Sequence, residues 1–385
     1  MTMQIRELVM HLYRVPLKQA VVTSFGSMRA RWALWVQLRD EEGVEGWGEV
    51  WCNFPDSGAL HRCRLLQDLF APLLPTLRGE GPAAMSAQLQ AAVRILRLQS
   101  AEFGPLDQCA AGLDTALWDL QARRQGLALH VLLRRQLGLP EPLGAMRVRA
   151  YASGIPPQDA GLSVERALAD GHAAFKVKVG FGCSVDTQAL RQARAAAGAQ
   201  LLAADANQAW NLDEARSMLR ELQPFELGWL EEPLPADAEL AQWQTLKHEA
   251  SMPLALGENI NSLRGFDSML RSGAVGVMQP DLAKWGGLTG CLEVVRLCHQ
   301  HGVRYCPHYL GGAIGLLASA HLLAAAGGDG LLEMDVNPNP LRTVALGEIL
   351  KPVDGWVALP ASPGLGLTPD LAALREWAHP LPASF

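Results

Sequence analysis

The chain has 385 residues, 49% of them hydrophobic and 19% charged, a composition that suits a soluble globular protein with a large core and more than one domain. A net charge of -6 offers no basic face for nucleic acid and no attraction to an anionic membrane, so neither is expected as a partner. The seven cysteines are odd in number and form no CxxC pair, and the N-terminus has no apolar segment of the signal-peptide kind. Both features predict a cytoplasmic protein with reduced thiols.

The first third of the chain reads as strands followed by helices. In residues 4–16 and 32–51 apolar and polar residues alternate, and an acidic turn folds the second stretch into an antiparallel hairpin. Residues 18–29, between these stretches, are expected to form a mixed loop. Helical periodicity then dominates residues 61–137. Strands first and helices after predict a compact α+β capping domain over residues 1–137.

From residue 147 onward, short apolar runs alternate with helical patterns of similar length. There are eight such runs, at 148–152, 174–179, 201–205, 228–231, 254–258, 275–281, 304–308 and 330–333. Eight strands separated by helices predict a (β/α)7β-type TIM barrel, of class α/β, over residues 138–350. An open doubly wound sheet is disfavoured because no GxGxxG opens a helix. Residues 351–385 are expected to be coil with a short helix near 371–377, packing back on the cap.

The second run carries two lysines, Lys176 and Lys178. In a strand these side chains point the same way, and their mutual repulsion lowers the pKa of one or both, as a base near neutral pH requires. Taken alone, the six residues 175–180 fit an edge strand with a solvated lysine face better than a catalytic lysine pair. The chain that follows favours a buried pair instead.

Seven of the eight runs carry, at or near their ends, a residue capable of acid–base or metal chemistry. These residues are Lys178, Asp205, Glu231, Glu258, Asp281, His308 and Glu333. In a parallel barrel the carboxyl ends of all strands open on one face, so such residues converge. A single carboxylate of this kind is more often a helix cap or a solvated loop acid. Seven residues in phase with the βα units predict a functional site.

Three successive strands would supply hard oxygen ligands: Asp205, Glu231 and Glu258. Such a set, with room for water and substrate oxygens, suits octahedral Mg2+, whereas zinc prefers histidine or thiolate, and only His308 and Cys306 are near. Asp281, one βα unit before His308, would fix the tautomer of the imidazole and raise its pKa. The pattern therefore predicts a metal flanked by two bases, Lys178 and His308.

Over essentially its whole length the chain resembles the enolase superfamily, mandelate racemase subgroup. The motifs that carry the resemblance are Lys176-x-Lys178, Asp205-x-Asn207, Glu231-Glu232-Pro233, Gly257-Glu258-Asn259, Asp281-x-x-Lys284-x-Gly286-Gly287 and His308. Each motif alone is a weak indication of the family, but the ordered set with this spacing is a strong one. Asp281 decides the subgroup, because the muconate-cycloisomerase and dipeptide-epimerase branch carries a lysine at this position.

The resemblance implies abstraction of the α-proton of a carboxylate substrate through an enediolate, with one Mg2+ per active site. Lys178 would be the base on one face of the α-carbon, with Lys176 depressing its pKa. His308, supported by Asp281, would serve the opposite face. Glu333 would donate a hydrogen bond to the substrate carboxylate. Lys284 and Asn207 would either contact that carboxylate or support the residues that do, and Ser153 is a further candidate contact.

Substrate specificity is expected to come from loops of the cap. Val21, Val22, Phe25 and Phe54 either line the pocket or simply pack the cap on the barrel, and both interpretations stay open. An apolar lining would leave the hydroxyls of a sugar acid without partners. It therefore favours racemisation or epimerisation of a 2-hydroxy acid or an N-substituted amino acid.

Dehydration of an acid sugar at the same site is the alternative. A Schiff-base aldolase would not need three carboxylates in phase, and a non-catalytic binding barrel would not need a metal set beside two bases. The resemblance also implies a homo-oligomer, since the family often forms dimers or octamers.

Overall fold

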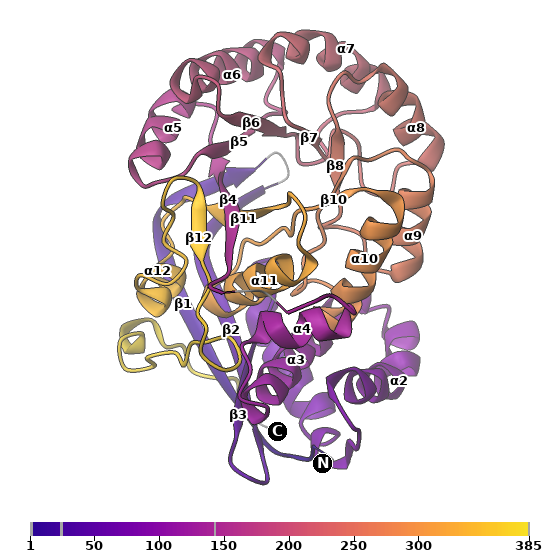
Figure 1. The fold of residues 1–385 in the computed structure, drawn as a ribbon, viewed down its shortest axis with the longest axis vertical. Coiled ribbons are helices and arrows are strands. Elements are labelled where there is room, and N and C mark those ends of the chain that lie inside the picture. Colours follow the sequence, from indigo (N-terminus) through magenta and orange to yellow (C-terminus); the bar gives the residue numbers. More distant parts are fainter. Residues whose placement is uncertain (1–2, 24–25, 142–143, 384–385) are drawn as a thin grey trace.

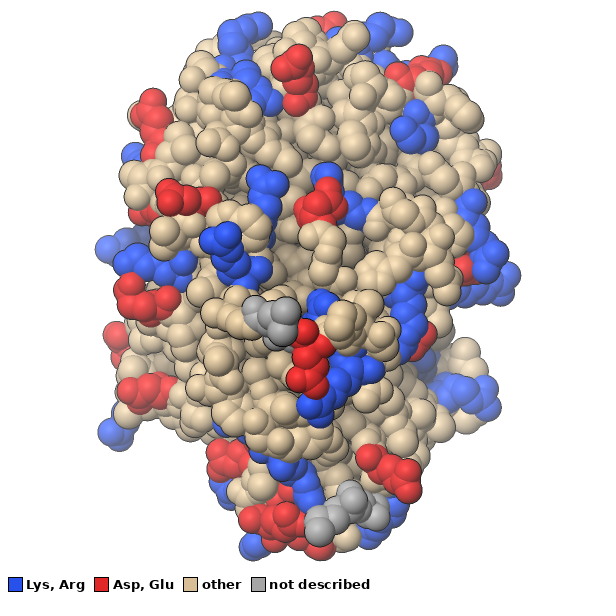
Figure 2. Space-filling model, in the orientation of Figure 1, with Lys and Arg blue, Asp and Glu red and all other residues tan. Residues whose placement is uncertain are grey.

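The computed structural model describes residues 3–23, 26–141 and 144–383. In Figure 1 the N-terminal strands and helices lie below and beside a ring of strands surrounded by helices. No helix in these ranges is long and apolar enough to cross a membrane. On the face that Figure 2 shows, acidic and basic side chains are interspersed, as the small net charge leads one to expect.

The cap begins with three antiparallel strands in sequence order, β1 (Ile5–Thr23), β2 (Gly26–Asp40) and β3 (Glu45–Val50). The expected hairpin of β2 and β3 is confirmed, and its turn contains Gly43 at φ 81°, a conformation that glycine adopts without strain. The loop expected at residues 18–29 is wrong. β1 continues through Thr23: after an irregularity between Pro16 and Val21, residues 21–23 pair with residues 26–28 of β2, because the β-branched residues Val21, Val22 and Thr23 favour a strand.

The cap helices follow, as the periodicity predicts: α1 (Gly58–Leu65), the π-helical η1 (Leu66–Phe70), the 3-10 turn η2 (Leu74–Thr76), α2 (Pro82–Ser100), α3 (Phe103–Arg124) and α4 (Leu129–Gln136). Helix α3 is buried along most of its length and packs against β3. The close approach of β3 to α3 needs glycine at position 48, since a Cβ there would lie 1.9 Å from the carbonyl oxygen of Gly112. β3 and α3 therefore pack with their backbones in direct contact.

The predicted barrel is confirmed. Its eight strands are β4 (Arg147–Ile155), β5 (Ala174–Lys178), β6 (Leu201–Asp205), β7 (Leu230–Glu231), β8 (Leu254–Leu256), β9 (Val277–Met278), β10 (Arg304–Tyr305) and β11 (Leu331–Asp335). They are parallel, in the order β10-β9-β8-β7-β6-β5-β4-β11. The seven intervening helices are α5 (Ala160–Ala169), α6 (Cys183–Ala197), α7 (Leu212–Leu222) with the 3-10 turn η3 (Gln223–Phe225), α8 (Leu240–Glu249), α9 (Leu263–Arg271), α10 (Gly287–His301) and α11 (Ala313–Ala326).

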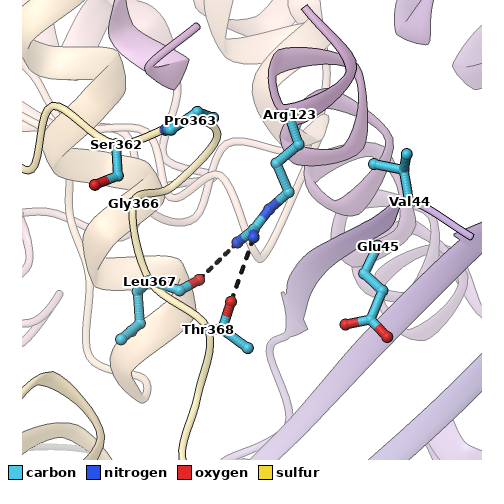
Figure 3. Close-up of a pocket in the computed structure, with 8 residues that line it drawn as sticks. All are labelled: Val44, Glu45, Arg123, Ser362, Pro363, Gly366, Leu367 and Thr368. Atoms are coloured by element: carbon cyan, nitrogen blue, oxygen red, sulfur yellow. Dashed lines mark hydrogen bonds between the residues drawn. The ribbon is translucent and has the colours of Figure 1, made fainter. Parts of the chain in front are cut away.

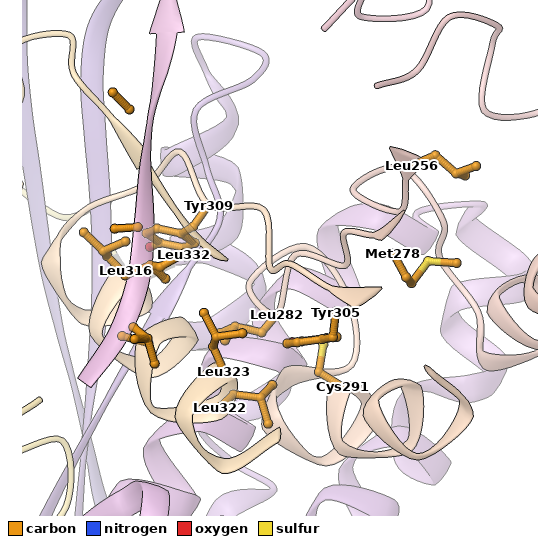
Figure 4. Packing of buried hydrophobic residues seen from close by; sticks show 14 of the residues in the cluster. Leu256, Met278, Leu282, Cys291, Tyr305, Tyr309, Leu316, Leu322, Leu323 and Leu332 are labelled. Atoms are coloured by element: carbon orange, nitrogen blue, oxygen red, sulfur yellow. The ribbon is translucent and has the colours of Figure 1, made fainter. Parts of the chain in front are cut away.

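Apolar side chains fill the barrel interior below the site. The innermost cluster takes one residue from each strand or its immediate neighbour: Tyr151, Ala174, Ala203, Trp229, Ala255, Val277, Cys306 and Leu331. The rings of Tyr151 and Trp229 pack edge to face, with their centroids 5.2 Å apart. A second shell packs the strands on the outer helices (Figure 4). This packing leaves the carboxyl ends of the strands for polar side chains.

The tail contacts both parts of the molecule. After α12 (Pro340–Leu346), the strand β12 (Trp356–Ala358) pairs antiparallel with β4 of the barrel. The chain then returns to the cap, where Arg123 of α3 donates to the carbonyl oxygen of Leu367 at 2.6 Å and to Thr368 Oγ1 at 3.3 Å (Figure 3). The helix expected near 371–377 is only the 3-10 turn η4 (Arg375–Trp377). The domain divisions at 137 and 350 stay predictions.

Candidate active site

Strand β5 places both lysines inside the barrel mouth, so the edge-strand alternative is wrong. β5 pairs on both sides, with β4 and β6, and the Lys176 side chain is 1% exposed. Its ammonium group lies 2.7 Å from Glu231, 2.9 Å from Glu333 and 3.6 Å from Asp205. Lys176 therefore neutralises three buried carboxylates that come from β6, β7 and β11.

Lys178 lies further out and contacts the next strand. Its Nζ is 2.6 Å from Asp205 Oδ2 and 2.8 Å from Asn207 Oδ1. Burial lowers the pKa of Lys178 and Lys176 lowers it further, but attraction to Asp205 raises it more, so the net shift is upward. Lys176 lowers the pKa of Lys178, as expected, but the net pKa is not depressed, because Asp205, 2.6 Å from Nζ, and Glu231 outweigh burial and Lys176 together.

His308 follows β10 and meets Asp281, which follows β9. Nδ1 of the imidazole lies 2.8 Å from Asp281 Oδ2, and Nε2 contacts Glu258. The backbone N–H groups of Ala283 and Lys284 donate to the other oxygen of Asp281 and fix its orientation. Burial lowers the pKa of His308, but Glu258 and its other carboxylate neighbours hold it well above its usual value. The imidazole is therefore held protonated.

The three predicted metal ligands lie at the ends of β6 and β7 and just after β8. Each pairs with a cation: Asp205 with Lys178, Glu231 with Lys176, and Glu258 with His308 and Lys284. Within the described ranges, no three His, Cys, Asp or Glu side chains are grouped to hold a metal.

The chemistry of this donor set nevertheless fits a divalent cation. Burial raises the pKa of Glu231 most, and repulsion by the charge of Asp205 raises it further, to about 7. The ionised forms of these carboxylates therefore destabilise one another. A hard dication would relieve that repulsion, and carboxylate oxygens are its preferred ligands.

Two residues of the site were not predicted to belong to it. Gln279 donates from Nε2 to Glu231 at 2.6 Å, and it lies two residues before Asp281, so strand alternation could have found it. Glu232, quoted only as part of a motif, is buried and accepts two hydrogen bonds from Asn259. Burial, and next the charge of Glu258, raise the pKa of Glu232 to about 8.

Two of the predicted substrate contacts, Ser153 and Lys284, lie in different parts of the site. Ser153 is buried near the end of β4. Lys284 Nζ lies 3.4 Å from both Asn259 Oδ1 and Glu258 Oε2, and 5.2 Å from the ring centre of Trp51 in the cap. A cation over an indole face is attracted by the ring. The contact therefore joins a site lysine to the cap loop.

The cap loop is described in part. The ring of Phe54 is half-buried, with its centre 6.0 Å from that of Trp51. Val21 and Val22 belong to β1, but their side chains, like all of Phe25, lie outside the described residues. An apolar lining from these residues stays a prediction.

A parallel barrel with lysines, carboxylates and a His–Asp pair at its strand ends, closed by an α+β cap, is the architecture of an enolase-superfamily enzyme. The chain belongs to the mandelate racemase/muconate lactonizing enzyme family. The N-terminal domain of that family matches residues 5–134, and the enolase C-terminal domain-like family matches residues 160–373.

Solved structures and curated relatives agree with this assignment. A mandelate racemase/muconate lactonizing enzyme from Bordetella bronchiseptica RB50 is 46% identical, with a TM-score of 0.90 over 98% of this chain and 99% of that one. An enolase from Bradyrhizobium complexed with magnesium and mandelic acid is 25% identical, with a TM-score of 0.83 over 99% of each chain. D-galactarolactone cycloisomerase of Agrobacterium fabrum is 28% identical and D-galactonate dehydratase of Ralstonia pickettii 27%, each over 90% of this chain and 91% of the relative.

Proposed function

We propose that this enzyme removes the α-proton of a carboxylate substrate in the presence of Mg2+, and that it racemises or epimerises a 2-hydroxy acid or an N-substituted amino acid. The observation that carries the proposal is the placement of the two basic groups. Lys178 is on β5 and His308 follows β10, with four strands between them on one side and two on the other. The two groups therefore face one carboxylate cluster from opposite sides of the barrel mouth.

The residues of the site would divide the work. Asp205, Glu231 and Glu258 would hold Mg2+, which supplies positive charge to stabilise the negative charge left on the substrate as its proton departs. Asp205 keeps the proton on Lys178 in this structure, so Lys178 becomes a base only when the charge of Asp205 is neutralised. The magnesium in the Bradyrhizobium neighbour supports the choice of metal.

Neighbours of the two bases would keep them in place. Asn207 accepts a hydrogen bond from Lys178 and orients its amine. Asp281 holds the His308 ring with Nε2 facing the carboxylates. Proton removal at one face and delivery at the other would invert the α-carbon.

Dehydration of an acid sugar is the second candidate. The raised pKa of His308, caused by Glu258 and Glu333 acting against burial, keeps this imidazole protonated and able to deliver a proton to a leaving β-hydroxyl. The names of two curated relatives, a galactonate dehydratase and a galactarolactone cycloisomerase, favour sugar acids as a substrate class. Formation of a 2-keto acid would identify this reaction.

A Schiff-base aldolase is disfavoured, because it needs a neutral amine. Burial lowers the pKa of Lys176, but Glu231 and Glu333 raise it well above its usual value, and the group is fully paired. Free cysteines, six of the seven buried, support the proposed cytoplasmic location. A homo-oligomer stays a prediction.

Proton exchange in D2O tests the proposal. Stereoisomeric hydroxy acids, sugar acids and N-substituted amino acids are incubated with enzyme and Mg2+, and deuterium at the α-carbon is measured by NMR. We expect Lys178→Ala to abolish exchange from one stereoisomer and His308→Asn from the other, whereas Lys351→Ala, at an exposed site, should change neither. Equal loss of both senses in single-turnover exchange would refute the two-face assignment.

A further inference from the structure

The cap inserts a carboxylate into the start of a barrel helix. Glu49, in β3, is 3% exposed. Its Oε1 accepts a hydrogen bond from the backbone N–H of Gly312 at 2.6 Å, and its Oε2 accepts one from Gly315 at 3.0 Å. Gly312 is the N-cap residue of α11 and Gly315 lies in its first turn, where backbone N–H groups have no partner within the helix. Glu49 satisfies two of them and adds a negative charge where the helix dipole favours one.

The segment held by Glu49 is the one that carries His308. Only three residues separate His308 from Gly312, and the other end of this segment is also fixed. The backbone N–H of His308 donates to Pro280 at 3.2 Å, and that of Tyr309 donates to Glu333 at 3.2 Å. A short segment anchored at both ends transmits a displacement of either anchor to the imidazole.

The segment also packs tightly against Glu49 and against itself. A Cβ on Gly312 would lie 2.8 Å from Glu49 Oε1, so the backbone lies directly against the cap carboxylate. A Cβ on Gly315 would lie 2.1 Å from the hydroxyl of Tyr309, which belongs to the same segment. Both positions therefore need glycine.

A second cap carboxylate makes the same kind of contact with the neighbouring helix. Asp114 of α3 accepts hydrogen bonds from the backbone N–H of Thr289 at 2.9 Å and from its hydroxyl at 2.5 Å. Thr289 is in the first turn of α10, which follows the loop that carries Asp281. Both members of the His–Asp pair thus precede a helix that is anchored on the cap. Lys178, in contrast, is held by Asp205 and Asn207, which belong to the barrel.

We propose that Glu49 is a positioning residue that couples docking of the cap to the placement of His308, and so to only one of the two bases. The inference rests on the proposed function for its catalytic consequence. Its structural part, that Glu49 holds residues 308–315, stands on the hydrogen bonds alone.

The test compares Glu49→Gln with a matched control. Asp119→Asn changes another buried cap carboxylate, which accepts backbone N–H groups from Trp47 at 2.8 Å and Leu365 at 2.6 Å and pairs with Arg123 at 2.9 Å. Among the described residues, neither catalytic loop contacts it. We expect Glu49→Gln to slow exchange from the His308 face by about tenfold or more, since misplacement by ~1 Å can cost ~100-fold, and to change exchange from the Lys178 face less than about twofold. Asp119→Asn should affect both faces equally.

Amide hydrogen exchange read by mass spectrometry gives a second readout that needs no substrate. Residues 309–316 should lose protection in Glu49→Gln and keep it in Asp119→Asn. Unchanged protection in Glu49→Gln, equal slowing of both faces, or the same asymmetry in Asp119→Asn would each overturn the inference. If Glu49→Gln does not fold, Asp114→Asn should show the same asymmetry through Asp281, and its absence would count against the proposal. A wild-type enzyme that exchanges no α-proton would refute the proposed function, while the protection data would still decide whether Glu49 anchors the segment.

Discussion

Replacement of Lys176 by methionine should expose how much the buried charges of the site depend on one cation. Methionine keeps the apolar stem of the side chain and removes the ammonium. Three carboxylates, within 2.7 to 3.6 Å of that group, then remain buried without it. Removing one partner of a buried ion pair costs about 3–5 kcal/mol, so Lys176→Met should lower the apparent free energy of unfolding by about that amount without Mg2+.

Added Mg2+ should then stabilise the variant more than the wild type, because the dication replaces a missing charge in one protein and competes with a lysine in the other. Urea unfolding followed by tryptophan fluorescence, with and without Mg2+, measures both effects. Lys351→Met is the control, since its ion pair with Glu348 is exposed and its loss should not move the midpoint. A Lys176→Met midpoint equal to that of the control, or an equal gain from Mg2+ in variant and wild type, would refute the reasoning.

Two further predictions concern regions away from the site. His130 of α4 and His321 of α11 are buried with their Nδ1 atoms 3.1 Å apart, and burial lowers the pKa of His130 to about 4 and that of His321 to about 3. As the pH falls, the unfolded chain therefore binds protons before the folded one. The free energy of unfolding should be unaffected by these histidines above pH 6.5 and should fall below it by up to about 1.4 kcal/mol per pH unit for each group. His321→Gln should reduce that slope, as measured by urea unfolding at pH 7, 6 and 5. Cys183 is the exposed member of seven free cysteines, so a thiol reagent should label one group quickly in the native protein and all seven in urea, and more than one fast group would contradict the packing.

Local patterns of the chain predicted the barrel and the membership of most of the site. Strand alternation depends on neighbours a few positions apart, and the regular spacing of chemically capable residues follows the length of one βα unit. Asp205, Glu231 and Glu258 could therefore be assigned to adjacent strand ends from the amino-acid sequence alone. The same local patterns gave the wrong prediction at residues 18–29, where a mixed composition obscured the pairing of residues 21–23 with residues 26–28.

Only the tertiary structure decided the charge state of the bases and the link between cap and barrel. The direction of the pKa shift of Lys178 depends on the balance of burial and Lys176, which lower the pKa, against Asp205, which raises it, and spacing along a strand does not show that balance. Glu49 lies 263 residues from Gly312 in the chain, and neither residue carries a local signal of the contact. The sequence thus determined which groups meet at the barrel mouth, because strand geometry has a fixed period. Distances between strands and between domains decided what those groups do, because electrostatic and hydrogen-bond energies depend on ångströms in space rather than on positions along the chain.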